Sequence, residues 1–332
     1  MSHSSINTIT TVEREPATAL SENDLPPIEG FPSLDESPLP LPDMLDHSFE
    51  EPFRYCLNTS TLRGFNLPLW DLVDIAASAG YEAIEPWVSE IEAYRKGGGD
   101  LMALRDHIRD LGLTVESAIG FFEWAVDDEA RRLQGMQDAR AAMSLVGKIG
   151  GKRIAAPAWG AHTKDAPALD LLAVAERYDA LLKLGELKQV IPMVEVWGFS
   201  KNISRLGEAL LIATECGNPD ACILGDVYHF YKGGSAVDAL RYVACGDAFK
   251  VFHVNDYPYL PRETITDADR VFPGDGIAPL SVIFRTLKEG GFNGHLSLEL
   301  FNTEYERTMD PLSIARTGLD KLRECVKQTF EY

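Results

Sequence analysis

The sequence predicts an α/β protein built as a (β/α)8 TIM barrel, and three observations point to this fold. After residue 52, eight short β-type runs alternate with eight segments of helical hydrophobic period. Residues 53–332 are long enough for such a barrel, which typically needs about 250 residues. Several runs are almost continuously apolar, as parallel strands covered on both faces require. A doubly wound sheet is the competing architecture, but no GxGxxG follows the first run, so the barrel is favoured.

Each expected strand is a short apolar run. In chain order the runs are Tyr55–Asn58, Ala83–Pro86, Thr114–Ala118, Arg153–Ala156, Pro192–Val196, Ile223–Asp226, Lys250–Val254 and Leu296–Leu300. The expected helices are Leu69–Ala79, Leu101–Leu111, Glu129–Lys148, Leu169–Leu182, Leu206–Thr214, Ala236–Tyr242, Leu280–Lys288 and Ile314–Gln328. Apolar residues recur in them at three- and four-residue spacing, as at Leu72, Ile75 and Ala76. Glycines such as Gly80 and Gly112 stand at helix-to-strand junctions, where a helix C-cap favours glycine.

The segment before the barrel has a different composition. Residues 1–52 contain eleven acidic side chains, one arginine, no lysine and eight prolines. Such a segment buries too little apolar surface to offset its ordering entropy, so we expect a disordered or extended arm. Docking of this arm on another subunit, through apolar residues such as Phe31 and Leu39, is the alternative. The expected organisation is an arm at 1–52 and one catalytic barrel at 53–332.

Charge and composition exclude several classes of protein. The formal net charge of -20 disfavours binding to a nucleic-acid backbone. No apolar run reaches the roughly 20 residues of a membrane helix, and the first residues lack the pattern of a secretory signal. Five cysteines without CxxC spacing fit a reducing compartment, so we expect a cytoplasmic protein. Homo-oligomerisation is possible.

Polar residues stand at the ends of the last four expected strands, where barrel active sites lie. These residues are Glu195, Asp226, His253 and Glu299, with His229 three residues beyond Asp226. One carboxylate in an apolar run can be explained by an ion pair, and one histidine by a hydrogen bond. Four on successive strands are better explained by a divalent metal ion, Mn²⁺, Mg²⁺, Co²⁺ or Zn²⁺.

Longer motifs carry a family resemblance. They are CLNTSTL (56–62), GYEAIE (80–85), DVYHFYKGG (226–234), HVNDYPYLPRETITDADRVFPGDGIAPL from His253, LKEGGF, and LSLELFNTEY. With them, residues 54–332 resemble the xylose-isomerase-like TIM-barrel superfamily of sugar isomerases and epimerases, and within it the inosose isomerases. The resemblance implies that Glu195, Asp226, His253 and Glu299 are the metal ligands. It also implies that His229 contacts a substrate hydroxyl and that Arg270 is a basic residue near the substrate.

The implied chemistry moves a carbonyl group to a neighbouring carbon by way of an enediolate. A metal ion chelated by the carbonyl and the adjacent hydroxyl would stabilise that enediolate. Glu195 and Glu299, on expected strands five and eight, flank the two faces of the sugar as general base and general acid. Glu195 acting alone gives a same-face 1,2-shift and both together give epimerisation, and the sequence leaves this choice open.

Further substrate contacts are expected from residues at the ends of earlier strands. Tryptophans follow expected strands two to five: Trp87, Trp124, Trp159 and Trp197. Aromatic faces pack against the C–H faces of cyclic polyols, although these rings could instead plug the barrel end. Trp197 stands where the family resemblance suggests a smaller or different residue. Glu85 and Asn58 either bind hydroxyls or hold loops by hydrogen bonds.

No phosphate cradle is evident, so the expected substrate is an unphosphorylated cyclic polyol-ketone or a free ketose. Two alternatives remain open. One is a metal-dependent lyase or dehydratase on a keto-sugar or inosose, in which the same enediolate expels a leaving group. The other is a non-catalytic sugar-binding barrel. DNA-repair endonucleases of this fold are disfavoured by the charge and by the small number of histidines at the expected strand ends.

Overall fold

The computed structural model describes residues 51–243 and 247–331. Its eight strands form one sheet of parallel pairs, in the order β3-β2-β1-β8-β7-β6-β5-β4. The strands are β1 Arg54–Asn58, β2 Ala83–Glu85, β3 Thr114–Val115, β4 Arg153–Ala156, β5 Ile191–Glu195, β6 Ile223–Asp226, β7 Phe249–Val254 and β8 His295–Leu298. The predicted runs are therefore strands, with ends that differ by a few residues at most.

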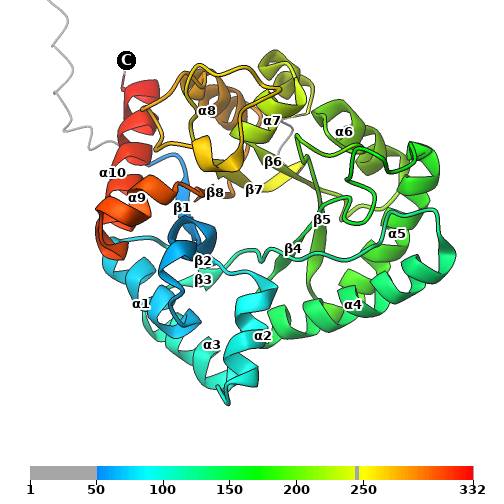
Figure 1. Ribbon diagram of the computed structural model, residues 1–332, viewed down its shortest axis with the longest axis horizontal. Coiled ribbons are helices and arrows are strands. Elements are labelled where there is room, and N and C mark those ends of the chain that lie inside the picture. Colours follow the sequence, from blue (N-terminus) through cyan, green and yellow to red (C-terminus); the bar gives the residue numbers. More distant parts are fainter. Residues whose placement is uncertain (1–50, 244–246, 332) are drawn as a thin grey trace, which may run out of the picture. The chain divides into compact units, whose positions relative to one another are not determined.

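Helices surround the strands (Figure 1). They are α1 Leu69–Ala79, α2 Val88–Lys96, α3 Leu101–Asp110, α4 Glu129–Lys148, α5 Leu171–Lys188, α6 Leu206–Glu215, α7 Val227–Gly233, α8 Leu280–Glu289, α9 Thr303–Thr308 and α10 Pro311–Phe330. Short 3₁₀ turns lie at Thr59–Phe65, Val237–Tyr242 and Asp267–Asp269. The predicted TIM barrel is confirmed.

The barrel closes between the two terminal strands of the sheet order, β3 and β4. The amide of Lys152 donates to the Val115 carbonyl at 3.3 Å. Further along, Ala118 donates to Arg153 at 3.1 Å and Ala155 donates to Ala118 at 2.9 Å. These backbone bonds extend beyond the two residues of β3, so the predicted run Thr114–Ala118 pairs along most of its length.

Two hydrophobic clusters occupy opposite faces of the curled sheet. The larger one packs the strands against the surrounding helices. The smaller one consists of Ile119, Ala155, Met193, Cys222, Leu224 and Val251. Because strand side chains alternate between faces, this smaller set fills the barrel interior. Residues two positions further along a strand face inward too, one layer closer to the end of the strand.

Four segments differ from the sequence prediction. The predicted helix Ala236–Tyr242 is a 3₁₀ turn, Val237–Tyr242, in a segment too short to sustain several helical turns. The short helices α2, α7 and α9 were not predicted: α7 and α9 have seven and six residues, and α2 buries only Ile91, so none shows a clear hydrophobic period. The Asp226 carboxylate accepts the His229 amide at 2.9 Å and so caps α7, which makes this strand-end residue a helix start as well.

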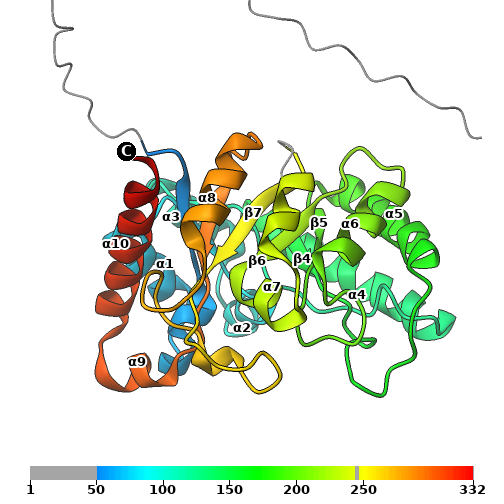
Figure 2. The ribbon, with the colours of Figure 1, turned by 90° about the horizontal axis from the view of Figure 1, so that it is seen from above.

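The long connection from β7 to α8 and the short helix α9 lie at the same end of the barrel (Figure 2). The proposed arm at 1–52 falls almost wholly outside the described residues, and so do its predicted disorder and docking. Within residues 51–243 and 247–331, no helix combines the length and the apolar character needed to cross a membrane.

Candidate active site

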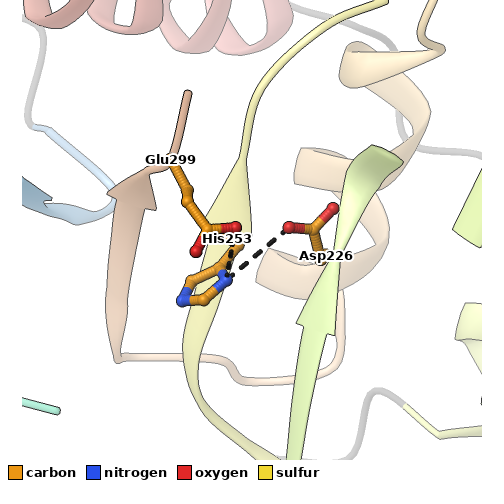
Figure 3. A group of neighbouring side chains, drawn as sticks. All are labelled: Asp226, His253 and Glu299. Carbon is orange, nitrogen blue, oxygen red and sulfur yellow. Dashed lines mark ion pairs between the residues drawn. The ribbon is translucent and has the colours of Figure 1, made fainter. Parts of the chain in front are cut away.

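Three of the four residues predicted as metal ligands meet at the ends of neighbouring strands. Asp226 ends β6, His253 lies in β7, and Glu299 directly follows β8. His253 Nδ1 lies 3.2 Å from Glu299 Oε2 and 3.6 Å from Asp226 Oδ2, and Figure 3 shows the two carboxylates converging on the imidazole. One donor atom from each residue lies within 4.8 Å of the others, and all three side chains are buried.

Glu195 lies outside this three-residue group, but Glu195 and Glu299 both line one cavity at this end of the barrel. It ends β5, and its Oε2 atom is buried without a hydrogen-bond partner among the residues that the structure describes. Burial raises the pKa of Glu195 to about 8, and the nearby charges of Glu299 and Asp226 add to the rise against the opposing effect of His253. A buried carboxylate oxygen with no partner is costly, so this atom is available for a ligand.

Arg270 enters the cluster from the long connection after β7. It is buried, and its Nη1 donates to Glu299 Oε2 at 2.7 Å and to Asp226 Oδ2 at 3.1 Å. Its Nη2 lies 3.2 Å from His229 Nε2 and donates to Asp267 Oδ1 at 2.6 Å. Burial alone would raise the pKa of Asp226, but Arg270 and His229 outweigh it and hold that pKa well below its usual range.

Asp256 sets the position of the segment that carries Arg270. Its backbone exchanges two hydrogen bonds with Val271, at 3.0 and 2.8 Å. Its carboxylate accepts the amides of Tyr257 at 2.7 Å, Gly274 at 3.0 Å and Ala278 at 2.8 Å. Sequence reasoning assigned Asp256 no role, although an acid just after a strand and before a glycine-rich loop is the available signal.

Glu85 and Asn58 form a supporting layer behind His253. Glu85 Oε2 accepts from His253 Nε2 at 2.9 Å, from Ser297 Oγ at 2.7 Å and from Asn58 Nδ2 at 2.9 Å. Burial alone would lower the pKa of His253, but Glu299 and Glu85 outweigh it and keep that pKa well above its usual range. This carboxylate fixes which nitrogen of the ring faces the other two acids, as such partners do for metal-binding histidines.

The cavity that Glu195 and Glu299 line is small and has aromatic walls. Its volume is about 140 Å³. Its lining residues are Trp87, Ile119, Phe121, Glu195, Trp197, Phe199, His229, Asp267, Arg270, Glu299 and Phe301. Of the predicted substrate contacts, His229, Arg270, Trp197 and Trp87 line it. Sequence reasoning missed Phe121, Phe199 and Phe301, which stand in irregular segments without a periodic signal.

Other predicted contacts lie elsewhere among the described residues. Asn58 and Glu85 form the layer behind the cavity and make hydrogen bonds there, and their contact with substrate hydroxyls stays a prediction. Trp159 packs on Phe121, with ring centroids 5.0 Å apart, and lies outside the lining. Trp124 is fully buried and donates to the Pro157 carbonyl at 2.8 Å, so it belongs to the core and not to the mouth.

Comparison with known proteins places this geometry in a family. Residues 73–325 match the family model of the xylose isomerase-like TIM barrel. Two relatives are inosose isomerases. The one from Bacillus velezensis is 34% identical over 103 residues, 31% of this chain and 36% of the relative. The one from Halalkalibacterium halodurans is 31% identical over 128 residues, 39% of this chain and 45% of the relative. The chain thus matches less than half the length of these relatives.

A longer match joins the chain to the 3-dehydro-D-guloside 4-epimerase of Escherichia coli, 26% identical over 235 residues. It covers 66% of this chain and 82% of the relative. Among solved structures, the IOLI protein with a bound zinc atom has a TM-score of 0.75 and 20% identity, over 84% of this chain and all of that one. At this identity the likeness shows the fold. With the family model spanning most of the barrel, the chain belongs to the xylose isomerase-like TIM-barrel family.

Proposed function

We propose that this protein is a divalent-metal-dependent isomerase or epimerase of small sugars or cyclic polyol-ketones. The observation that carries the proposal is the buried cluster of Asp226, His253 and Glu299, of which Glu299 lines a ring-sized cavity together with Glu195 and its unpartnered oxygen. The inosose isomerase and guloside epimerase relatives support this class of reaction.

The donor set fits a divalent cation. Asp226, His253 and Glu299 would each supply one donor atom to it, and Glu195 Oε2 would complete the set. Carboxylate and imidazole donors of this kind suit Mn²⁺, Mg²⁺, Co²⁺ or Zn²⁺, and the zinc atom of the IOLI protein supports a metal here. When bound, the ion supplies Lewis acidity toward a carbonyl and its neighbouring hydroxyl.

The remaining chemistry belongs to the side chains of the chain itself. Glu195 and Glu299 both line the cavity and come from strands β5 and β8, so they can reach a bound ring from different sides. One removes the proton from the carbon beside the carbonyl and the other returns a proton. With a pKa raised to about 8, Glu195 exchanges its proton near neutral pH.

Binding groups orient the ring between these two acids. His229 and Arg270 present nitrogen atoms to its hydroxyls, while Arg270 stays fixed by Asp267 at 2.6 Å. Aromatic rings such as Trp197 and Phe199, with centroids 4.4 Å apart, pack against C–H faces and exclude water.

Metal analysis and proton exchange test the proposal together. We expect the purified protein to contain about one divalent ion per chain and to exchange a carbon-bound proton of an inosose or ketose with solvent deuterium. A product of unchanged formula indicates isomerisation or epimerisation, and loss of water indicates the dehydratase alternative. Absence of exchange across a panel of inososes, ketoses and keto-glycosides, in protein with full metal content, would contradict the proposal.

A further inference from the structure

A second, larger cavity adjoins the substrate cavity. The inner cavity, with a volume of about 140 Å³, and the outer one, with a volume of about 560 Å³, share Trp87 and Phe121 as a common wall. The outer cavity lies between the turn Thr59–Phe65 and the start of α2 (Val88–Lys96). Because the same two side chains line both cavities, the cavities are neighbours, and a molecule too large for the inner one can extend toward the outer one.

The inner cavity has room for one ring. An empty protein cavity of about 150 Å³ is enough to bind benzene, so 140 Å³ holds a six-membered ring and little more. Catalytic and binding groups such as Glu195, Glu299 and Arg270 occupy its polar side. Any bulky group attached to the reacting ring must therefore leave the inner cavity, and the shared wall offers an adjoining space.

The outer cavity has both apolar and polar lining residues, as binding sites for hydroxylated rings do. Leu62, Leu67 and Trp87 supply apolar surface, and Asn66 and Ser89 supply polar groups. Such a combination binds a pyranose or aryl ring through its faces and its edge at once.

The polar walls of this cavity are held in place. The Arg63 guanidinium lies over the Trp87 ring at 3.5 Å, an arrangement that fixes both side chains. Glu90 accepts from Thr59 Oγ1 at 2.6 Å and from the Trp87 amide at 2.9 Å. The shared wall is therefore braced from the outer side, which gives a bound group a preformed surface.

We infer that the substrate is a keto-glycoside whose oxidised ring occupies the inner cavity and whose aglycone, itself a ring, occupies the outer one. This inference rests on the proposed isomerase or epimerase activity and names the substrate class for it. One proton leaves a carbon of the oxidised ring and one proton returns, so the glycosidic bond stays intact and no oxidant or reductant enters.

Two probes that differ only in the aglycone test the inference. Calorimetry on the full-length, metal-loaded protein would compare methyl 3-keto-β-glucoside with phenyl 3-keto-β-glucoside. We expect the phenyl compound to bind about tenfold more tightly, because its ring loses apolar surface to water only if the outer cavity receives it.

A variant that fills the outer cavity can be compared with a control that carries the same substitution elsewhere. Ser89 is exposed in the first turn of α2 and lines only the outer cavity, so Ser89→Trp should abolish the preference and leave binding of the methyl compound unchanged. Ser281, exposed in the first turn of α8, lines a different cavity, and Ser281→Trp should keep the preference.

The outcomes separate the two claims. Equal binding of the two probes, or a preference that survives Ser89→Trp, overturns the keto-glycoside inference even if inososes and ketoses exchange deuterium. A preference that Ser89→Trp removes, in a protein that exchanges no proton from any of these compounds, supports the binding assignment and overturns the proposed reaction instead.

Discussion

Two buried charge clusters stand at the two ends of the barrel interior, and they differ in how their charges are balanced. At the end where the strands begin, called the lower end here, Glu116 pairs with Lys152, with Arg153 at 3.1 Å and with His295 Nδ1 at 3.8 Å. Arg153 and His295 are the first residues of β4 and β8. One carboxylate there faces two permanent cations, so the cluster has no need of a further positive group.

At the end where the strands finish and the candidate active site lies, called the upper end, negative charges outnumber positive ones. Four buried carboxylates gather there: Glu85, Glu195, Asp226 and Glu299. The cations within ion-pairing distance of them, among the described residues, are Arg270 and the imidazole His253. Two of the acids, Glu85 and Glu195, each keep a buried oxygen without a partner in that part of the chain. The same residue types thus build a self-sufficient ion pair at one end and a site short of positive charge at the other.

The largest expected effect is a loss of turnover when a carboxylate at the upper end is replaced. Glu195→Gln and Glu299→Gln should each lower turnover about 10³-fold or more, because neither amide can take up and return a proton. Glu195→Gln should leave the free energy of unfolding unchanged or raise it, since the buried Oε2 atom of Glu195 makes no hydrogen bond that the substitution would break. Steady-state kinetics and thermal unfolding measure the two quantities. Full activity in both variants would remove the acid–base assignment.

The matching change at the lower end should act on stability alone. Glu116→Gln leaves Arg153 without its buried partner and should lower the free energy of unfolding by about 3 kcal/mol. Metal content and turnover at a permissive temperature should match the parent protein, because Glu116 has no contact with the upper cluster. A loss of metal affinity in this variant would show that the two clusters are coupled and would contradict the comparison.

Loss of an imidazole at the upper end should act on metal affinity. His253→Ala removes one of three converging donors, so we expect the affinity for the divalent ion to fall about 100-fold or more. Glu85→Gln, which removes only the partner of His253 Nε2, should lower it about tenfold. Titration with Mn²⁺ or Zn²⁺ measures both. Undiminished metal content in His253→Ala would exclude this residue as a ligand.

The two ends also differ in how far the sequence predicted them. Glu195, Asp226 and Glu299 stand at the ends of apolar runs, and period-two alternation turns such residues into the barrel, so the upper cluster could be predicted. Glu116 lies beyond the short strand β3, and its partners depend on the stagger between β3 and β4, which no local pattern encodes.

Long-range contacts limited the prediction of the upper end too. Arg270 is identifiable from the family motif, but its contacts with two strand-end carboxylates require the fold of the whole connection that Asp256 organises. The aromatic wall formed by Phe121 and Phe301 comes from irregular segments, where neither period nor capping pattern applies. Periodicity therefore predicts the barrel and its inward residues, whereas loop side chains need the three-dimensional structure.

The smallest expected effect is a pH dependence of stability from the lower cluster. Burial lowers the pKa of His295 to about 4, against the attraction of Glu116 and with help from Arg54, Lys152 and Arg153. Between pH 6.5 and 4 the unfolded chain therefore binds a proton that the folded protein excludes, so stability falls as the pH falls, by about 2 kcal/mol over this range. Chemical denaturation at a series of pH values measures it, and His295→Gln should flatten the curve there. An equally steep curve for that variant would place the dependence on other groups, and a rise in stability on acidification would mean that the folded cluster holds His295 protonated.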